Sequence, residues 1–297
     1  MSDGPTGFPQ PPEEPWIPPR PDVPPGSSVG MPSPTDMPPP TGAPAPTGLP
    51  APTGMPAPTG SDGVRPRSTW KWWEAILVFF LGLILGGLVA TPIVLMFGTT
   101  NAATVATNVI GEIVPGALLI LWLRTYHKEW RGAIGFPRRE KAPGEIARGV
   151  GFGLILYIVI AFGVGTILTL FFEQASGKNA HTPEQLPHLS GIAIFWAALL
   201  ALLVAPMVEE LFFRGCLFRS LRDRHSFPLA AVVSAFCFGL VHYVPGPWQD
   251  TLLLMTIMVF TGLGLAWFYD RRGNIVASMA AHATFNLIGL ILILSTR

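Results

Sequence analysis

The chain has 297 residues, of which 49% are hydrophobic and 12% are charged, and its formal net charge is +1. Soluble proteins carry about 25% charged residues, so this composition indicates a membrane protein. The small net charge gives no sign of nucleic-acid binding. The two cysteines, Cys216 and Cys237, lack the spacing of a disulfide framework or a zinc site.

The first 66 residues contain 22 of the 32 prolines and no apolar run, so we expect no cleavable signal peptide. A six-residue unit, PAPTG followed by Leu or Met, repeats between Pro44 and Gly60. Such a sequence buries too little apolar surface to fold and is typical of extended, polyproline-like chains. We therefore predict that residues 1–66 form a disordered tail, which acts as a spacer or as a docking tract for a proline-binding partner.

Seven apolar segments follow, and each is long enough, or nearly so, to cross about 30 Å of hydrocarbon. They are Ala75–Phe97, Ala102–Leu123, Gly149–Phe172, Leu189–Val208, Phe227–Val244, Thr251–Tyr269 and Ile275–Leu294. Two glycine pairs, Gly82 with Gly86 and Gly149 with Gly153, have the spacing that lets helices pack closely in lipid. The sequence therefore predicts an all-α integral membrane protein, with a bundle of about seven transmembrane helices over residues 67–297.

Lysine and arginine are distributed unevenly between the two sides of these segments. Sixteen of them flank the spans on the side of the tail, whereas only Lys178 and Arg297 lie on the opposite side. Cytoplasmic loops carry such an excess of positive residues. We therefore predict a multi-pass protein of the cell membrane, with the N-terminus in the cytoplasm and the C-terminus outside.

The fourth segment ends in a charged motif, EELFFR at 209–214, after twenty residues without Asp, Glu, Lys or Arg. Charges at this depth in a bilayer are costly and usually have a function. Glu210 and Arg214 are four residues apart and share a helix face, whereas Glu209 is turned away from Glu210 by about 100°. Arg214 is thus predicted to neutralise Glu210 and to leave Glu209 free for chemistry. The alternative is an ion pair that only sets the depth of the helix.

Two further polar motifs lie in the spans. The fifth segment contains FGLVH, which ends at His242, and the seventh contains HATFN, in which His282 and Asn286 are four residues apart. Both side chains of that pair need polar partners in lipid. Glu112, in the second segment, has no polar companion four residues away, and we interpret it as a helix-packing residue.

Spacing along the chain predicts that these motifs lie at one depth. Glu209 and His282 each lie ten residues from an interfacial arginine, roughly 15 Å from the cytoplasmic face. Glu209 and His242 are equally far from the turn at residues 225–226, so an antiparallel hairpin places them level with each other.

A carboxylate, two imidazoles and a carboxamide in one intramembrane pocket suit peptide hydrolysis. Glu209 would act as the general base on water, and His242 would orient that water or bind a metal. His282 and Asn286 would donate hydrogen bonds to the oxyanion that forms at the attacked carbonyl. No motif for a nucleophilic serine or cysteine and no HExxH sequence is found.

The three motifs, EExxxR, FxxxH and HxxxN, in this order and on these segments, resemble those of the CAAX prenyl endopeptidase family. Bacterial members of this family are called Abi or CPBP intramembrane peptidases. The resemblance covers about residues 189–294 and implies an intramembrane endopeptidase that cleaves a peptide or a membrane-associated protein.

The resemblance also implies roles for seven residues. Four would be catalytic, as base, water-activating and oxyanion residues, and three would support them. The catalytic set is Glu209, His242, His282 and Asn286, and the supporting set is Glu210, Arg214 and Phe238.

Two questions remain open from the sequence. The same buried groups could serve a carrier or a proton relay, or the chain could be a non-enzymatic accessory or immunity factor of the membrane. The second question is whether the reaction needs a metal. We favour a reaction without a cofactor, because the carboxamide of Asn286 is a poor zinc ligand but a good oxyanion donor. The alternative is one zinc ion bound by Glu209, His242 and His282.

Overall fold

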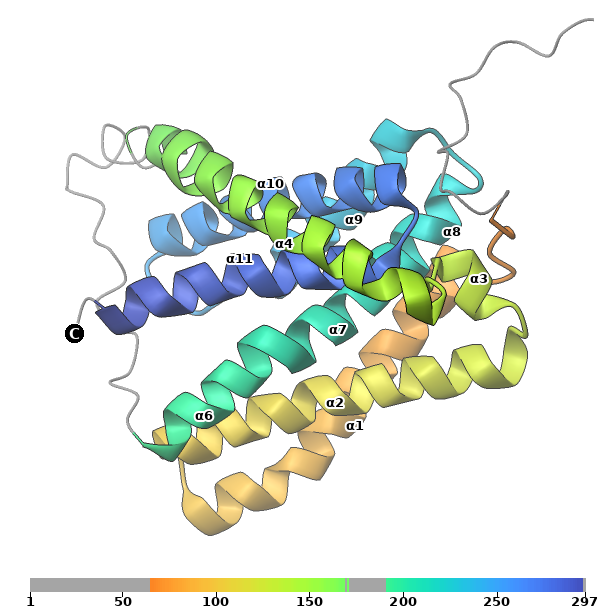
Figure 1. Ribbon diagram of the computed structural model, residues 1–297. Coiled ribbons are helices and arrows are strands. Elements are labelled where there is room, and N and C mark those ends of the chain that lie inside the picture. Colours follow the sequence, from red (N-terminus) through yellow and green to blue (C-terminus); the bar gives the residue numbers. More distant parts are fainter. Residues whose placement is uncertain (1–64, 169, 171–190, 296–297) are drawn as a thin grey trace, which may run out of the picture. The chain divides into compact units, whose positions relative to one another are not determined.

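The computed structural model describes residues 65–168, 170 and 191–295, whose regular structure is helical (Figure 1). Six helical runs in this part are long and apolar enough to cross a membrane. They are α1 (Trp72–Phe97), α2 (Asn101–Tyr126), Trp130–Leu168, Ile192–Arg222, α10 (Trp248–Arg272) and α11 (Ile275–Ser295). The predicted all-α membrane fold is confirmed. The predicted tail, apart from its last two residues, lies outside the described residues.

Two of these runs consist of several helical pieces. The run Trp130–Leu168 contains α3 (Trp130–Ile134), the short 3₁₀ turn η1 (Arg139–Lys141), α4 (Ala142–Ile158) and the π-helical segment η2 (Val159–Gly165). The run Ile192–Arg222 contains α6 (Ile192–Leu199), η3 (Leu200–Val204), α7 (Ala205–Glu210), η4 (Leu211–Phe218) and α8 (Arg219–Arg222). The segments η3 and η4 are π-helical, and such segments are common at functional sites.

Local sequence explains where the first two helices begin and end. At the start of α1, the Lys71 backbone N–H donates to the Glu74 carboxylate over 2.8 Å, and the helix ends at Gly98, which has a φ of 67°. At the start of α2, the hydroxyl of Thr100 accepts from the backbone N–H of Ala103. The two helices are therefore separated by a tight turn and pack as an antiparallel pair.

The helices pack mainly in three pairs: α1 with α2, α4 with α11, and α9 (Phe227–Val241) with α10 (Figure 1). Both predicted glycine pairs lie at such interfaces. A Cβ atom at Gly86 would lie 3.0 Å from the carbonyl oxygen of Gly111, and one at Gly149 would lie 2.3 Å from that of Ala277. Close packing of these pairs therefore depends on the missing side chains.

The run Ile192–Arg222 contacts helices from all three pairs. Its first half packs on α2, its middle on α11, and the segment η4 on α1 and α9. The motif at 209–214 therefore lies at the junction of the bundle, where η4 is buried along its whole length.

One predicted span is shorter than expected. The sequence predicted a segment over Phe227–Val244, but α9 ends at Val241 after 15 residues. Its length is about 22 Å, less than the roughly 30 Å of a bilayer core. Gly246 with the prolines at 245 and 247 follows directly, and this sequence cannot continue a helix. The loop after His242 is therefore expected to lie below the membrane surface opposite the charged end of the bundle, where irregular backbone is tolerated beside water or protein.

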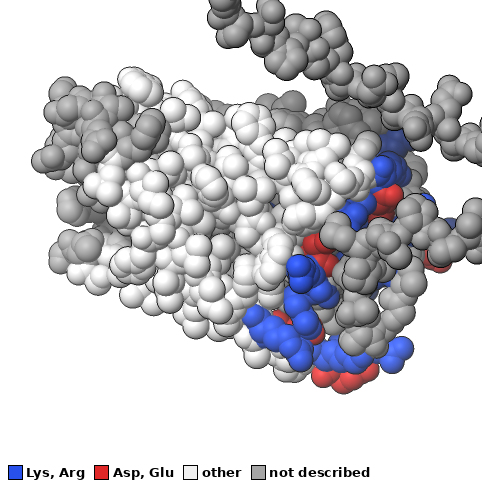
Figure 2. Space-filling model, turned by 90° about the horizontal axis from the view of Figure 1, so that it is seen from above, with Lys and Arg blue, Asp and Glu red and all other residues white. Residues whose placement is uncertain are grey.

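Charged side chains gather at one end of the bundle (Figure 2). Helix ends that are far apart in sequence meet there: Arg272 pairs with Glu145 at 2.7 Å, and Arg222 pairs with Asp270 at 3.1 Å. Arg219 also donates to the carbonyl oxygen of Pro66 over 2.9 Å. The positive loops that the sequence assigns to one side of the membrane thus lie together in the structure.

Candidate active site

Glu209 and Glu210 end the short helix α7, between the two π-helical segments. Pro206 lies at the start of α7 and has no backbone N–H to donate to the preceding turn. Because adjacent residues of a helix are turned by about 100° from each other, the two carboxylates face different neighbours.

Glu210 is fully buried and has a partner for each oxygen. One oxygen, Oε1, lies 2.9 Å from an Arg214 nitrogen and 3.0 Å from Nδ1 of His282, and Oε2 accepts a hydrogen bond from the hydroxyl of Ser278. Arg214 also donates to the carbonyl oxygen of Gly262 over 3.1 Å. The pairing of Glu210 with Arg214 agrees with the four-residue spacing, and the network holds the buried charges together.

His282 connects the two glutamates. Because an ionised carboxylate only accepts hydrogen bonds, Nδ1 of His282 carries the proton in its bond to Glu210. The other ring nitrogen, Nε2, lies 3.9 Å from Oε2 of Glu209. A neutral His282 therefore presents an acceptor toward Glu209, and a protonated His282 presents a donor.

Glu209 differs from Glu210 in the hydrogen bonding of its carboxylate. Its side chain is 12% exposed, and its Oε2 atom is buried without a hydrogen-bond partner within residues 65–168, 170 and 191–295. An unpaired carboxylate oxygen in an apolar bundle is costly unless a water or a ligand binds it. This geometry leaves Glu209 available for chemistry.

His242 caps the end of α9 and is held by its own helix. Its Nδ1 atom lies 2.7 Å from the carbonyl oxygen of Phe238, which makes Nδ1 the donor and leaves Nε2 as an acceptor. The Phe238 ring contacts three site residues: its centroid is 4.6 Å from that of His242, 5.7 Å from that of His282, and 4.6 Å from the guanidinium carbon of Arg214. Phe238 thus packs against both imidazoles.

Asn286 has a different hydrogen-bond partner from His282. Its amide nitrogen donates to the carbonyl oxygen of Ala201 over 2.9 Å, in the segment η3. In a π-helical turn this carbonyl would accept from the residue five positions later, which is Pro206 and has no N–H. Asn286 therefore satisfies a carbonyl freed by the proline and connects α11 to the helix that carries Glu209.

Sequence reasoning missed Ser278 and gave Glu112 only a packing role. Ser278 lies four residues before His282 on the same helix face, and this spacing was the available signal. Glu112, interpreted above as a helix-packing residue, interacts electrostatically with Glu209 and has a buried oxygen without a partner in the described structure. It therefore belongs to the surroundings of the site.

The zinc ligands considered from the sequence are Glu209, His242 and His282. Among the described residues, no group of three or more His, Cys, Asp and Glu side chains is placed to hold a metal ion. In both histidines Nδ1 is engaged, by Glu210 in His282 and by the Phe238 carbonyl oxygen in His242, so Nε2 is the ring nitrogen that each would offer to a metal ion. The choice between a reaction without a cofactor and one zinc ion bound by Glu209, His242 and His282 stays a prediction.

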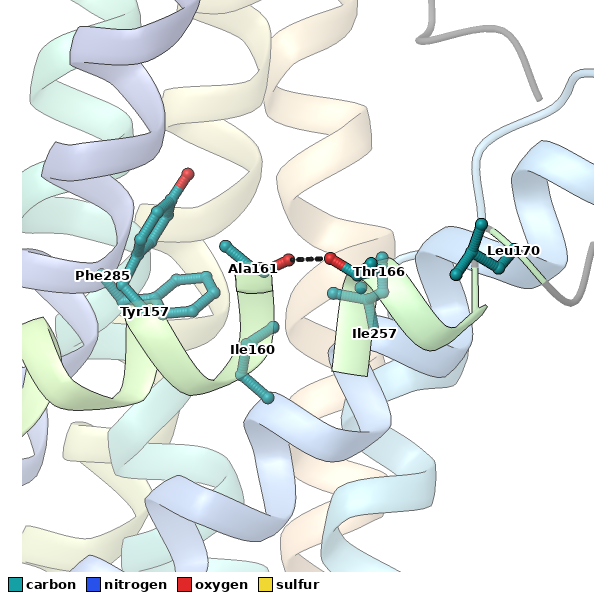
Figure 3. A pocket seen from close by; sticks show the side chains of 8 residues that line it. Tyr157, Ile160, Ala161, Thr166, Leu170, Ile257 and Phe285 are labelled. Atoms are coloured by element: carbon teal, nitrogen blue, oxygen red, sulfur yellow. Dashed lines mark hydrogen bonds between the residues drawn. The ribbon is translucent and has the colours of Figure 1, made fainter. Parts of the chain in front are cut away.

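A cavity of about 470 Å³ lies between the end of α4, η2, α10 and α11 (Figure 3). Apolar side chains such as Ile160, Ile257 and Phe285 line most of it, and the Thr166 hydroxyl donates to the carbonyl oxygen of Ala161 at its edge. None of the predicted site residues lines this cavity. The reactive groups therefore lie elsewhere in the bundle.

Comparisons with known proteins agree with the motifs. Residues 191–288 match the family model described as Type II CAAX prenyl endopeptidase Rce1-like. A Bacillus subtilis (strain 168) protein named "Putative membrane peptidase YdiL" is 23% identical over 233 residues, which cover 75% of this chain and 88% of that protein. The UPF0177 protein YxdF of Lactococcus lactis subsp. lactis (strain IL1403) is 32% identical over 137 residues, which cover 46% of this chain and 72% of that protein.

No solved structure gives a significant match. The matched region contains all three motifs and every site residue named above except Glu112. The chain belongs to the Rce1-like CAAX prenyl endopeptidase family.

Proposed function

We propose that this protein is an intramembrane endopeptidase in which Glu209 activates a water molecule to cleave a peptide or a membrane-associated protein. Family membership supports a membrane peptidase. The observation that carries the mechanism is the contrast between the two glutamates: Glu210 is fully partnered, whereas Glu209 has a buried, unpartnered oxygen 3.9 Å from Nε2 of His282.

The reaction follows from these positions. Glu209 accepts a proton from water while the water oxygen forms a bond to the scissile carbonyl carbon. A protonated His282, stabilised by Glu210, donates from Nε2 to the developing oxyanion. The second N–H of the Asn286 amide is available to donate to the oxyanion. The acceptor nitrogen of His242 is available to accept a hydrogen bond from the water. Glu209 then returns its proton to the amide nitrogen as the carbon–nitrogen bond breaks.

The test compares membrane proteomes of cells that carry the wild-type protein or Glu209→Gln. Peptides that accumulate in the variant are candidate substrates, and purified full-length wild-type protein is expected to cleave them in detergent. A carrier or proton relay would instead give solute or proton flux in liposomes without cleavage. A non-enzymatic accessory factor would give neither, and a Glu209→Ala strain would keep the full phenotype.

We propose that the reaction needs no metal, since the carboxamide of Asn286 is a poor zinc ligand but a good oxyanion donor. Purified active protein is expected to contain well under one zinc per chain and to stay active after chelation and dialysis. Zinc content by mass spectrometry and activity measured on the same sample check this expectation. Stoichiometric zinc, with activity lost on chelation and restored by zinc alone, would contradict it.

We also propose that the basic end of the bundle faces the cytoplasm, because positive residues remain on that side. In a variant without the two native cysteines, Ser61→Cys is expected to react with an impermeant maleimide only after the membrane is opened. The matched control is Ser295→Cys, at the exposed end of α11, which should react in intact cells. The reverse labelling pattern would overturn this orientation.

A further inference from the structure

Helix α2 presents two faces to different neighbours. Gly111 and Pro115 lie against α1, where Cβ atoms at Gly86 and Gly82 would lie 3.0 Å and 2.4 Å from them. The adjacent face carries residues 112 and 116, which are also four residues apart and share a side of the helix.

The second face lies against the helix that carries Glu209. A Cβ atom at Gly116 would be 2.6 Å from a methyl carbon of Val208, the residue just before Glu209. Helix α2 also contacts α7 directly. Glu112, one turn before Gly116 on this face, therefore lies on the side of α2 that packs on the run carrying Glu209 and not on α1.

The carboxylates of Glu112 and Glu209 resemble each other in their hydrogen bonding. Oε2 of Glu112 and Oε2 of Glu209 are each buried and without a hydrogen-bond partner in the part of the chain that the structure describes. The two groups also interact electrostatically. Two unpaired carboxylate oxygens in an apolar bundle are costly, and a residue that only packed helices together would be better replaced by an apolar one.

We propose that Glu112 is a further catalytic residue, which binds the attacking water together with Glu209. A water between the two carboxylates can donate one O–H to each, which satisfies both oxygens and weakens their repulsion. One water lone pair is then directed toward the scissile carbonyl. This inference rests on the function proposed above.

The chemistry balances with one water. Glu209 takes the first proton, and the oxygen bonds to the carbonyl carbon while the second O–H stays on the intermediate and donates to Glu112. When the carbon–nitrogen bond breaks, Glu209 gives its proton to the nitrogen. The remaining proton leaves the new carboxyl group to solvent.

The charged and titratable groups that act on Glu209 come from its own helical run, from α2 and from α11. His282 faces it from α11 and Glu112 from α2, while Glu210 and Arg214 belong to its own run. Of these, Glu112 is the one that lies outside the three motifs, and its removal leaves the Glu210 network intact.

The test uses purified full-length protein and the peptide that accumulates in the Glu209→Gln strain. Glu112→Gln is expected to lower kcat by about 10²-fold with KM within about twofold, because it misplaces the water without changing substrate binding. Glu112→Asp should recover part of kcat. Glu112→Leu should be as inactive as Glu112→Gln and at least as stable, since it removes a buried unpartnered group.

The matched control is Thr107→Val on the same helix. The Thr107 hydroxyl bonds within its own helix to Ala103, so kcat should not change. If Glu112→Leu keeps wild-type kcat while Glu209→Gln is inactive, Glu112 is a packing residue and this inference alone is wrong. If wild-type and Glu209→Gln strains accumulate the same peptides, the proposed function is wrong, and the role proposed for Glu112 is then wrong as well.

Discussion

Glu209→Gln is expected to lower peptide hydrolysis by about 10²–10⁴-fold, the usual effect of losing a general base. Glutamine keeps the size of the side chain but cannot accept a proton from water at this position. The protein should remain folded, because the Glu209 carboxylate has no hydrogen bond at Oε2 to lose. Single-turnover cleavage of a defined peptide, with thermal unfolding of the same preparation in detergent, measures both quantities.

Glu129→Gln is a suitable control, since it makes the same chemical change at an exposed position outside the spans. It should leave both turnover and unfolding temperature unchanged. Wild-type turnover in Glu209→Gln would show that another group is the base. A large fall in unfolding temperature would show instead that Glu209 has a structural role.

Arg214→Ala is expected to cause the largest loss of stability of any single change in the site. Arg214 is 1% exposed, pairs with Glu210 at 2.9 Å, donates to Gly262 and lies over the Phe238 ring. Its removal leaves the Glu210 charge buried and uncompensated, which typically costs about 3–5 kcal/mol. Protein yield in the membrane and the unfolding temperature in detergent should both fall.

A double variant distinguishes the stranded charge from lost packing. Glu210→Gln combined with Arg214→Ala removes the uncompensated charge, so the double variant should be more stable than Arg214→Ala alone. Arg139→Ala, at an exposed position, is the matched control and should behave as wild type. If the double variant is less stable than Arg214→Ala, the main contribution of Arg214 is its packing and not its charge.

Features that depend on one helix or on composition could be predicted from the amino-acid sequence. Long apolar segments define the membrane helices, because a bilayer core of about 30 Å requires that length. The periodicity of a helix predicts that Arg214 pairs with Glu210 and leaves Glu209 turned away, since both relations lie within one run. The spacing of the glycine pairs likewise predicts which helix faces pack closely, because the absence of a side chain can be read from a single helix.

Contacts between helices were decided by the tertiary structure. Spacing places His282 and Asn286 on one side of α11, but packing turns His282 to Glu210 and Asn286 to the carbonyl oxygen of Ala201. The rotation of one helix against another depends on many side chains together, and π-helical turns shift it further.

The place of Glu112 was decided in the same way. The sequence shows a lone glutamate in an apolar helix, which favours a packing role. In the structure Glu112 lies on the face of α2 that packs on the run carrying Glu209, because Gly116 lets α2 approach Val208 closely. Close approach between two helices is a property of both surfaces, and one sequence pattern describes only one of them.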